Sequence, residues 1–585
     1  MKVRRGRRVL ISPISRPSRD DDGIGTPKPH LAFLLFRRLE PMKIIANTFF
    51  SHAPYGLIVV AFSAAYYALY INSGFNFSDA GNYAQICYEL FLGKDPAELV
   101  IGYGILWFKV GEFLFRIFGV DYALVNFIFF FCIVITNVLV FYVVNLATGT
   151  RPIALSAAAI SALVPAFPAT SFYALCVLLN VAAQMRLARG SLRPWDAALA
   201  GIALSFTFQI RPDFGYVFAV PLVVLIALAT FEQRGRWHVL SGAALAGFFV
   251  TLLFGLLAAM AGGYGSVFLQ QFMGYPAMMA GYFIDGVRAL FFERSLQGEF
   301  ANALLARPSI AGVFSDEAQI AQLALLIYLP ILMATAFAIL NAALFFGSER
   351  NSRFDVLAPA IVALSSAAAV FPHYFFYRPD MSHIANFMPG YIVLLAMLAS
   401  QIHQRFRKRM PIWERFAGSA ALAVLAVNLG VYLWAGLHSP GTGSIAIAAG
   451  RAEAFTAGNG VDVIVTPEEK AELGFLRDIV SQNSVPGDTI VCVPYCPGVA
   501  FMTERRMLLP NFYVDDAILT DRPGWLVEAS DLTRYVKPAV VIVIDWAING
   551  TDHSRFDVWA APYVVVVKGL SRNKVVNGNI TAYIL

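Results

Sequence analysis

Long apolar runs separated by short polar clusters dominate the pattern of this chain. Runs such as Ile58–Tyr70, Tyr122–Leu146 and Val239–Ala261 approach or exceed the roughly 20 apolar residues that cross about 30 Å of hydrocarbon. The pattern predicts about eleven transmembrane helices, near residues 54–72, 122–146, 152–167, 171–187, 196–210, 214–231, 239–262, 320–347, 356–371, 384–401 and 415–436. The fold class is therefore a polytopic α-helical membrane protein.

Basic residues between these runs predict which side of the membrane each loop faces. Eleven Lys and Arg residues precede Pro54, and further clusters lie at Arg186–Arg193, Arg234–Arg236, Arg350–Arg353 and Arg405–Arg409. Short loops rich in Lys and Arg stay in the cytoplasm. The sequence therefore predicts a basic cytoplasmic tail (residues 1–53), a membrane body (54–436) and a carboxyl terminus outside the cytoplasm.

Composition excludes several protein classes. Hydrophobic residues make up 58% of the 585 positions and charged residues 14%, whereas soluble domains average about 45–50% and 25%. A disordered chain, a nucleic-acid-binding arm and an ordinary cytosolic enzyme are excluded. Five cysteines are too few for a disulfide scaffold, and we expect Cys87, Cys132 and Cys176 to be small buried hydrophobic residues.

The segment Ile101–Phe118 is interpreted as an interfacial helix. It is long enough to cross the membrane, but Lys109, Glu112 and Arg116 lie at helical spacings of three and four. A further crossing here would also reverse the side of the later basic loops. The predicted outer loops of the body are then residues 72–121, 262–319 and 372–383.

Residues 437–585 have the pattern of a small soluble domain. A Gly/Ala/Ser-rich linker (439–460) precedes a capping-box pattern at Thr466 and Glu469. Short apolar runs at Thr489–Val493, Ala539–Ile544 and Tyr563–Val567 alternate with helix-like segments. This predicts an extracytoplasmic α/β domain with a mainly parallel sheet, serving as a lid or acceptor-binding module.

The cysteines of this domain form a Cys-x3-Cys pair, Cys492 and Cys496. A disulfide over three intervening residues is feasible in an oxidising compartment. The oxidised and reduced alternatives are both open at this point.

Asp79 is the first candidate for chemistry. It stands just beyond the first predicted helix, in the segment Phe75–Tyr83, among aromatic and small residues. One hypothesis makes it an N-cap of the helix-like stretch that follows. The other makes it a general base that takes the proton of an acceptor hydroxyl.

The tripeptide Arg-Pro-Asp occurs twice, at Arg211–Asp213 and Arg378–Asp380, and both copies are predicted at the outer face. Each could be a helix breaker with a self-neutralising pair. The second lies in an aromatic turn that ends at His383, where Arg378 could clamp a phosphate and His383 orient it. Arg211 is the alternative phosphate ligand. Secondary candidates for the site are Asp213, Asp380, His373 and Tyr374.

Together these segments resemble the GT-C superfamily of integral-membrane glycosyltransferases. The resemblance rests on Asp79, the following segment Tyr83–Gly93, the interfacial helix ending Leu114–Gly119, and the Arg378-x-Asp-x-x-His383 turn. Members include protein O-mannosyltransferases, lipid A aminoarabinose transferases and arabinofuranosyltransferases. It implies transfer of a hexosyl or pentosyl unit from a polyprenyl-phosphate donor, with Asp79 as catalytic base and Arg378 as donor-phosphate ligand.

The chain departs from the superfamily pattern in its first outer loop. Many members carry two acidic residues there, but Ala80 and Gly81 follow Asp79. One carboxylate is a poor divalent-metal site, so no metal site or cofactor is expected, although a divalent metal is left open. The expected partners are a polyprenyl-phosphate-linked sugar, membrane lipid and a glycan, glycolipid or protein acceptor, and no nucleic acid.

The expected location is the bacterial inner (plasma) membrane. The rival hypothesis is a transporter or flippase for a lipid-linked sugar. Transporters are commonly built from internal repeats and carry charged residues deep inside membrane helices, and the sequence shows neither. Transfer with inversion is therefore the favoured function.

Overall fold

The computed structural model describes residues 53–69, 71–100, 103–163, 168–190, 192–232, 237–274, 309–348, 353–371, 381–406, 412–438, 444–516, 518–546 and 555–585. Residues 55–585 form one compact unit. The predicted cytoplasmic tail and large parts of the predicted outer loops 262–319 and 372–383 lie outside the described residues.

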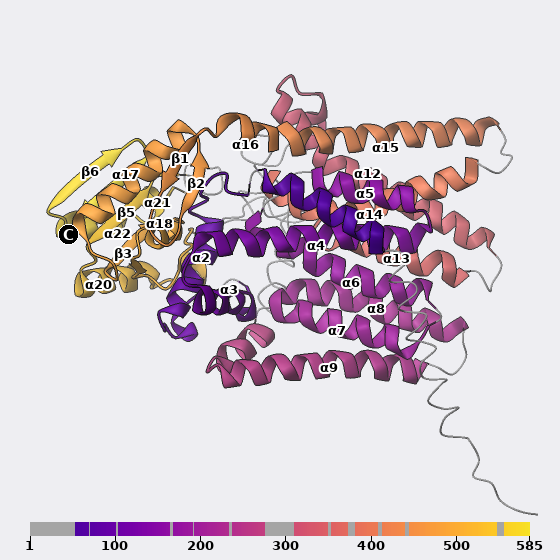
Figure 1. Cartoon of the computed structure of the whole chain (residues 1–585), viewed down its shortest axis with the longest axis horizontal. Helices are drawn as coiled ribbons and strands as arrows, with labels where there is room; N and C mark the ends of the chain where they lie inside the picture. Colours follow the sequence, from indigo (N-terminus) through magenta and orange to yellow (C-terminus); the bar gives the residue numbers. More distant parts are fainter. Residues whose placement is uncertain are drawn as a thin grey trace, which may run out of the picture. The chain divides into compact units, whose positions relative to one another are not determined.

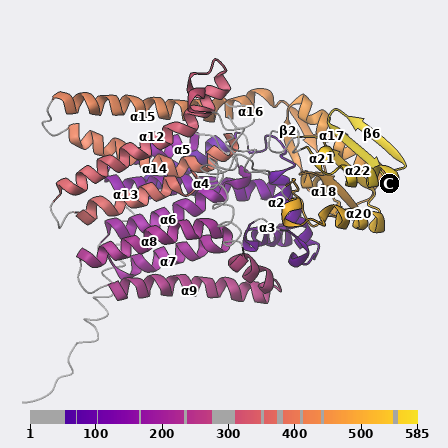
Figure 2. The same ribbon diagram turned by 180° about the vertical axis from the view of Figure 1, so that it is seen from behind.

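All eleven predicted membrane segments are helical in the part of the chain that the structure describes. The first is Ala53–Ala68. The others are α4 (Tyr122–Thr148), α5 (Arg151–Leu163), α6 (Phe172–Arg189), α7 (Pro194–Ile210), α8 (Pro212–Glu232), α9 (Trp237–Ala261), α12 (Ala318–Gly347), α13 (Arg353–Ala368), α14 (Met381–Phe406) and α15 (Ile412–His438). Figures 1 and 2 show α6, α7 and α9 side by side.

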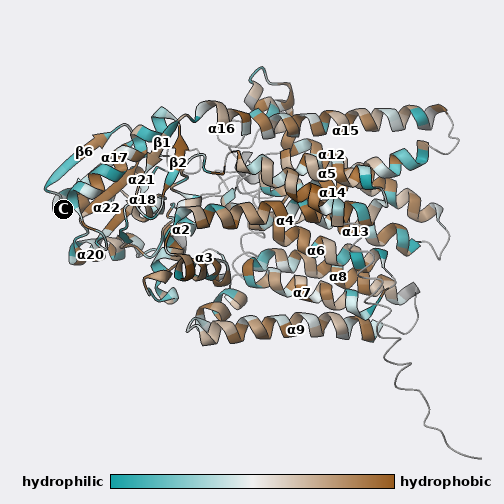
Figure 3. Cartoon of the chain, in the orientation of Figure 1, coloured by the Kyte–Doolittle hydropathy of each residue, from teal (hydrophilic) through white to brown (hydrophobic). Residues whose placement is uncertain are grey.

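Six of the described helices are long and apolar enough to cross a membrane: α4, α8, α9, α12, α14 and α15. Their outward faces carry large apolar side chains, as on α9, where Phe254 is 69% exposed and Phe249 57% exposed. Figure 3 shows the hydrophobic colour along these helices. Such surfaces are stable in hydrocarbon and not in water, so the chain is an integral membrane protein. The count of eleven crossings and their orientation stay predictions.

Two short helices follow the first membrane helix, within the predicted outer loop 72–121. α2 (Asp79–Phe91) and α3 (Ile105–Phe118) are separated by a single 3-10 turn, η1 (Pro96–Glu98). α3 has 14 residues and is about 21 Å long, too short to span the hydrocarbon. Lys109 and Arg116 both pair with Glu112, at 2.6 and 2.7 Å. The predicted charged, non-spanning helix is therefore present.

The C-terminal domain, described from Ser444 onward, is a small α/β domain. Its hairpin is β1 (Glu453–Thr456) with β2 (Asp462–Val465), and its five-stranded sheet has the order β4-β3-β5-β7-β6. The sheet strands are β3 (Thr489–Val493), β4 (Arg506–Met507), β5 (Val540–Ile544), β6 (Asn573–Asn577) and β7 (Ile580–Ile584). Its helices are α16 (Ser444–Gly450), α17 (Pro467–Asn483), α18 (Pro497–Met502), α19 (Ile518–Asp521), α20 (Trp525–Val536), α21 (Phe556–Trp559) and α22 (Ala561–Leu570).

Two sequence predictions for this domain are confirmed. The run Thr489–Val493 is a strand, β3, with four of its five residues buried. Thr466 begins α17 with a full capping box, in which its side chain accepts from the Glu469 N–H and the Glu469 carboxylate accepts from the Thr466 N–H. The capping box is formed by residues three positions apart, whereas β3 is held by its pairing with β4 and β5.

Three details differ from the sequence prediction. The run Tyr563–Val567 is helical and lies within α22, because Pro562 suits a first helical turn and Tyr563, Val564 and Val567 form one buried face at helical spacing. The sheet is mixed, since β6 and β7 run antiparallel to their neighbours. The predicted linker 439–460 contains α16 and β1, because β1 is held by its pairing with β2.

Candidate functional site

Asp79 occupies the first helical position of α2, directly after the loop of residues 71–78 (the 71–78 loop). The N-cap residue is Ser78, whose side chain makes no cap hydrogen bond. Asn76 caps the helix instead. Its Oδ1 accepts a hydrogen bond of 3.4 Å from the Ala80 N–H, and its backbone carbonyl accepts one of 2.8 Å from the Gly81 N–H. The cap hypothesis for Asp79 is therefore not what the geometry shows.

The Asp79 carboxylate faces a small aromatic pocket. Oδ1 of Asp79 accepts a hydrogen bond of 2.9 Å from the Tyr495 hydroxyl. The described residues that line the pocket are Asp79, Asn82, Tyr83, Tyr103, Trp107, Phe108, Ala169, Thr170 and Tyr495. They come from α2, α3, the 3-10 turn η2 (Pro168–Thr170) and the C-terminal domain. The cavity is about 10 Å³, roughly the space of one water molecule, whereas small-molecule sites measure about 300–1,000 Å³.

Three packed aromatic rings, those of Tyr83, Trp107 and Phe108, line part of this pocket. The Tyr83 ring lies 5.2 Å from the Trp107 ring and 5.5 Å from the Phe108 ring, and the Tyr83 hydroxyl donates to the Trp107 carbonyl. Cys87 lies one turn further along α2, and burial raises the pKa of its thiol. The expectation that Cys87, Cys132 and Cys176 are buried is confirmed.

Arg211 and Asp213 lie beside the pocket, at the junction of α7 and α8. The guanidinium makes two hydrogen bonds to Asp213, at 2.8 and 3.0 Å, and only 1% of Arg211 is exposed. Its carbon atom Cζ lies 4.0 Å from the ring centroid of Tyr173 and 5.3 Å from that of Tyr103. Tyr103 also lines the Asp79 pocket, so one ring lies between this predicted pair and the pocket. The ion pair between Arg211 and Asp213 matches the alternative in which the first Arg-Pro-Asp copy is a helix breaker with a self-neutralising pair.

The second Arg-Pro-Asp copy is not described by the structure. Arg378, Asp380, His373 and Tyr374 lie outside the described residues. His383 falls in the first turn of α14, but the position of its side chain is not described. Their roles stay predictions.

A second cavity, of about 320 Å³, lies on the other side of the 71–78 loop. Ala80 and Asn76 line it on either side of Asp79 in the sequence, and Ala169 borders both this cavity and the Asp79 pocket. Most other lining side chains are apolar or aromatic. Its charged edge is the ion pair between Arg451 and Glu469, 3.1 Å apart. No sequence motif indicated this cavity.

The C-terminal domain contacts the 71–78 loop at both of its ends. At its start, Gly74 donates to the Ile464 carbonyl at 2.8 Å and Ile464 donates to the Asn72 carbonyl at 2.9 Å. At its end, the Gly498 N–H donates to the Phe77 carbonyl at 2.8 Å. The loop therefore forms backbone hydrogen bonds with a domain that begins more than 300 positions later in the chain.

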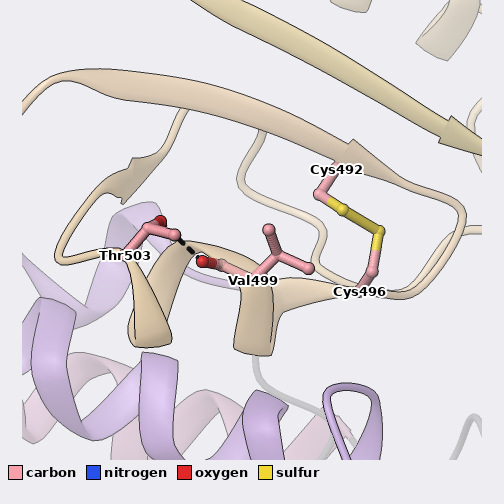
Figure 4. The surroundings of a disulfide bond; sticks show 4 residues. All are labelled: Cys492, Cys496, Val499 and Thr503. Atoms are coloured by element: carbon pink, nitrogen blue, oxygen red, sulfur yellow. Dashed lines mark hydrogen bonds between the residues drawn. A yellow bond between two sulfur atoms is a disulfide. The ribbon is translucent and has the colours of Figure 1, made fainter. Parts of the chain in front are cut away.

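A disulfide joins Cys492, in β3, to Cys496, the N-cap residue of α18, with 5.4 Å between their Cα atoms. Figure 4 shows the bond between the end of the strand and the helix, with Thr503 donating to the Val499 carbonyl further along α18. Of the two alternatives left open by the sequence, the structure shows the oxidised one. Tyr495 lies inside the bridged segment, so the Cys-x3-Cys motif was the one sequence signal near it.

A buried carboxylate ties α2 to the same domain. Glu89 is fully buried, and its Oε2 accepts from Nε and Nη2 of Arg506 at 3.1 and 3.0 Å. Its Oε1 accepts from the Met507 N–H at 2.8 Å and from the side chain of Gln85 at 3.0 Å. Four hydrogen bonds compensate the loss of hydration of this charge. α2 thus carries Asp79 at one end and an anchor to the domain near the other.

No group of three His, Cys, Asp or Glu side chains that could hold a metal ion occurs among the described residues. The polar side chains that line the pocket in this part of the chain are the Asp79 carboxylate, Asn82, Thr170 and the tyrosine hydroxyls, beside the rings of Trp107 and Phe108.

Comparisons with known proteins give structural matches only. No protein-family model matches the sequence and no curated protein matches it. An Archaeoglobus fulgidus oligosaccharyltransferase in the apo form matches with 13% identity and a TM-score of 0.45, over 84% of this chain and 69% of that one. The archaeal oligosaccharyltransferase AglB from the same organism, in complex with an inhibitory peptide and a dolichol-phosphate, matches with 12% identity and a TM-score of 0.47, over 88% and 72%.

ArnT from Cupriavidus metallidurans bound to undecaprenyl phosphate also matches, with 12% identity and a TM-score of 0.47, over 91% of this chain and 98% of that one. AglB and ArnT are GT-C glycosyltransferases, the superfamily that the sequence resembles. All these TM-scores lie below 0.5, so the function proposed below rests on the residues of this chain.

Proposed function

We propose that this protein is a membrane glycosyltransferase that moves a sugar from a polyprenyl-phosphate-linked donor to a hydroxyl acceptor. The observation that carries the proposal is the position of Asp79. Among the described residues that line the aromatic pocket, it is the one acidic side chain. The same position is assigned to the catalytic base by the sequence resemblance. Aromatic rings around one carboxylate provide apolar surface beside a group that can take a proton.

Asp79 is proposed as the general base. An acceptor hydroxyl is a weak nucleophile, and a positioned carboxylate that takes its proton contributes about 10²–10⁴-fold to the rate. Tyr495 already occupies Oδ1, whereas Oδ2 has no hydrogen-bond partner among the described residues. We therefore assign the proton transfer to Oδ2. The acceptor oxygen bonds to the anomeric carbon, the carbon–phosphate oxygen bond breaks, and the electron pair leaves with the phosphate.

This displacement inverts the anomeric configuration, because the hydroxyl enters opposite the departing phosphate. The phosphate needs no protonation to leave, so one carboxylate suffices and no metal is required by the scheme. The proposed donor-phosphate ligands are Arg378 and His383, with Arg211 as the alternative. A phosphate at Arg211 would have to compete with Asp213 for the same guanidinium.

The orientation proposed from the basic loops completes this scheme. The amino terminus lies in the cytoplasm, and Asp79, the aromatic turn and the C-terminal domain lie on the opposite side of a bacterial plasma membrane. Acceptors on that side are glycans, glycolipids or proteins. The pocket itself does not distinguish a hexosyl from a pentosyl donor.

Release of polyprenyl phosphate tests the proposal. Purified protein in lipid vesicles is mixed with a panel of polyprenyl-phosphate sugars and acceptors, and released polyprenyl phosphate and glycosylated acceptor are measured together. We expect the wild-type protein to produce polyprenyl phosphate and glycosylated acceptor in equal amounts, and Asp79→Asn to produce neither. A transporter or flippase would move the donor across the vesicle membrane without releasing polyprenyl phosphate, and that result would replace the proposal with its rival.

A further inference from the structure

The parallel part of the C-terminal sheet has a natural ligand crevice. From β3 the chain passes through α18 to β4 on one side of β3, and it later returns to β5 on the other side. In open α/β sheets, ligands bind outside the carboxyl ends of the strands at the point where the strand order reverses. Here that point lies between the ends of β3 and β5.

In this protein the residues that follow β3 and β5 contact Phe77 of the 71–78 loop and Asp79, the first residue of α2. Tyr495, just after β3, donates to Asp79. Trp546, just after β5, stacks on Phe77 with 6.0 Å between ring centroids and 12° between ring planes. The domain therefore holds the segment Phe77–Asp79 where other sheets of this kind hold a ligand.

The 71–78 loop depends on these contacts for its own backbone. Three carbonyls of the loop accept from the C-terminal domain: that of Asn72 from a backbone N–H, that of Ser73 from Arg451 at 2.7 Å, and that of Phe77 from Gly498. Departure of the domain would break all three hydrogen bonds, and water would have to replace them.

We infer that the C-terminal domain is a permanent half of the active site, in which Tyr495 is a positioning residue for Asp79. The Cys492–Cys496 disulfide closes the segment that carries Tyr495 and so holds its hydroxyl on the carboxylate. This inference rests on the proposed function of Asp79. It replaces the sequence-based hypothesis of a lid, since a lid would part from Asp79 in each cycle.

Kinetics of three variants test the inference. Tyr495→Phe removes only the hydroxyl, and we expect kcat to fall about 10- to 100-fold, the range for loss of one hydrogen bond to a charged group. The KM values for donor and acceptor should stay within about twofold, because the Tyr495 ring that lines the pocket is kept and only its hydrogen bond to Asp79 is lost. The matched control is Tyr563→Phe, which removes a buried hydroxyl that forms a hydrogen bond with Thr533 and belongs to neither the 71–78 loop nor the Asp79 pocket. It should keep wild-type kcat.

The disulfide is tested by non-additivity. Replacing both cysteines (Cys492→Ala with Cys496→Ala) should lower kcat in the wild-type background and add no further loss in the Tyr495→Phe background, since groups that act as one unit are not additive. If the double cysteine variant does not fold, dithiothreitol on wild type and on Tyr495→Phe gives the same comparison. Effects that multiply, a wild-type kcat for Tyr495→Phe, or a loss confined to KM would each overturn the inference.

Hydrogen exchange separates this inference from the proposed function. Without any substrate, the peptide that covers Ser73–Asn82 should exchange faster in the double cysteine variant than in wild type, and at the wild-type rate in Tyr563→Phe. Faster exchange in a protein that transfers no sugar would contradict the proposed function and leave the positioning intact. Unchanged exchange in an active protein would overturn the positioning.

Discussion

Gly81 of α2 and Gly498 of α18 cross so closely that neither position has room for a side chain. A Cβ on Gly81 would lie 2.5 Å from the Gly498 Cα, and a Cβ on Gly498 would lie 2.6 Å from the Phe77 Cα. The obstructing atoms are backbone, so no change of rotamer relieves the clash. The two glycines thus set how closely the C-terminal domain approaches the segment that carries Asp79.

The first prediction concerns this crossing. Gly498→Ala should destabilise the protein by about 1–3 kcal/mol, the usual effect of inserting a methyl group into a packed contact, and should lower sugar transfer because Phe77 moves. Thermal unfolding in detergent and the polyprenyl phosphate assay measure the two effects. Gly474→Ala is the matched control, since a Cβ there meets nothing within 4 Å within α17, and helical Gly→Ala stabilises by about 0.5–1 kcal/mol. Equal melting of wild type and Gly498→Ala would show that the crossing is looser than described.

The second prediction concerns the anchor between Glu89 and Arg506. The Arg506 side chain is 35% exposed and Glu89 is fully buried, so the two single changes should differ. Arg506→Met leaves a buried carboxylate without its main counter-charge and should cost about 3 kcal/mol. Glu89→Gln should cost less, because Arg506 can turn to water, and the double variant should recover part of the loss. Unfolding midpoints check the order, and equal losses for the two single variants would contradict it.

The third prediction separates a base from a structural role at Asp79. Asp79→Asn keeps the size of the side chain and can still accept from Tyr495, but it cannot take a proton. We expect the variant to fold, to bind lipid-linked donor and to lose about 10²–10⁴-fold in transfer rate. Donor binding and single-turnover transfer are the measurements. If Asp79→Asn transfers at the wild-type rate while Asp79→Ala unfolds, the role is structural, and Asp213 and Asp380 become the next candidates for the base.

The fourth prediction compares the two Arg-Pro-Asp arginines. Arg378→Ala should weaken donor binding by the equivalent of about 1.5–3 kcal/mol without lowering the melting temperature, and Arg378→Lys should restore it only in part, because a guanidinium binds phosphate through two parallel hydrogen bonds. Arg211→Ala should instead lower the melting temperature, because it leaves the Asp213 carboxylate, 14% exposed, without its partner. Donor binding by Arg378→Ala at wild-type strength would remove it from the site.

The fifth prediction is topological. A reporter that is active only in the cytoplasm, fused after Leu585, should be silent, and the same reporter at the amino terminus should be active, because the basic loops alternate consistently with the opposite side. Activity of the carboxyl-terminal fusion would place Asp79 and Tyr495 in the cytoplasm. The proposed use of an extracytoplasmic acceptor would then be wrong.

Much of the candidate site could be indicated from the sequence because its signals are local. A lone Asp79 beyond the first apolar run, and a charged helix too short to span, are visible in stretches of fewer than 20 residues. The pairing of Arg211 with Asp213 is local as well, since only Pro212 separates them. The sequence did not indicate the aromatic lining of the pocket, which α2, α3 and η2 build together, or the 320 Å³ cavity behind the 71–78 loop.

The sequence by itself determined the helical membrane body, because the length of an apolar run sets whether it can cross hydrocarbon, whatever the rest of the chain does. It also determined the capping box at Thr466, because the two bonding residues, Thr466 and Glu469, are three positions apart. Only the tertiary structure decided that Tyr495 donates a hydrogen bond to Asp79 and Arg506 to Glu89. These pairs are 416 and 417 positions apart in the chain. Contacts of this kind depend on how whole elements fit together, and no local pattern in the chain records that fit.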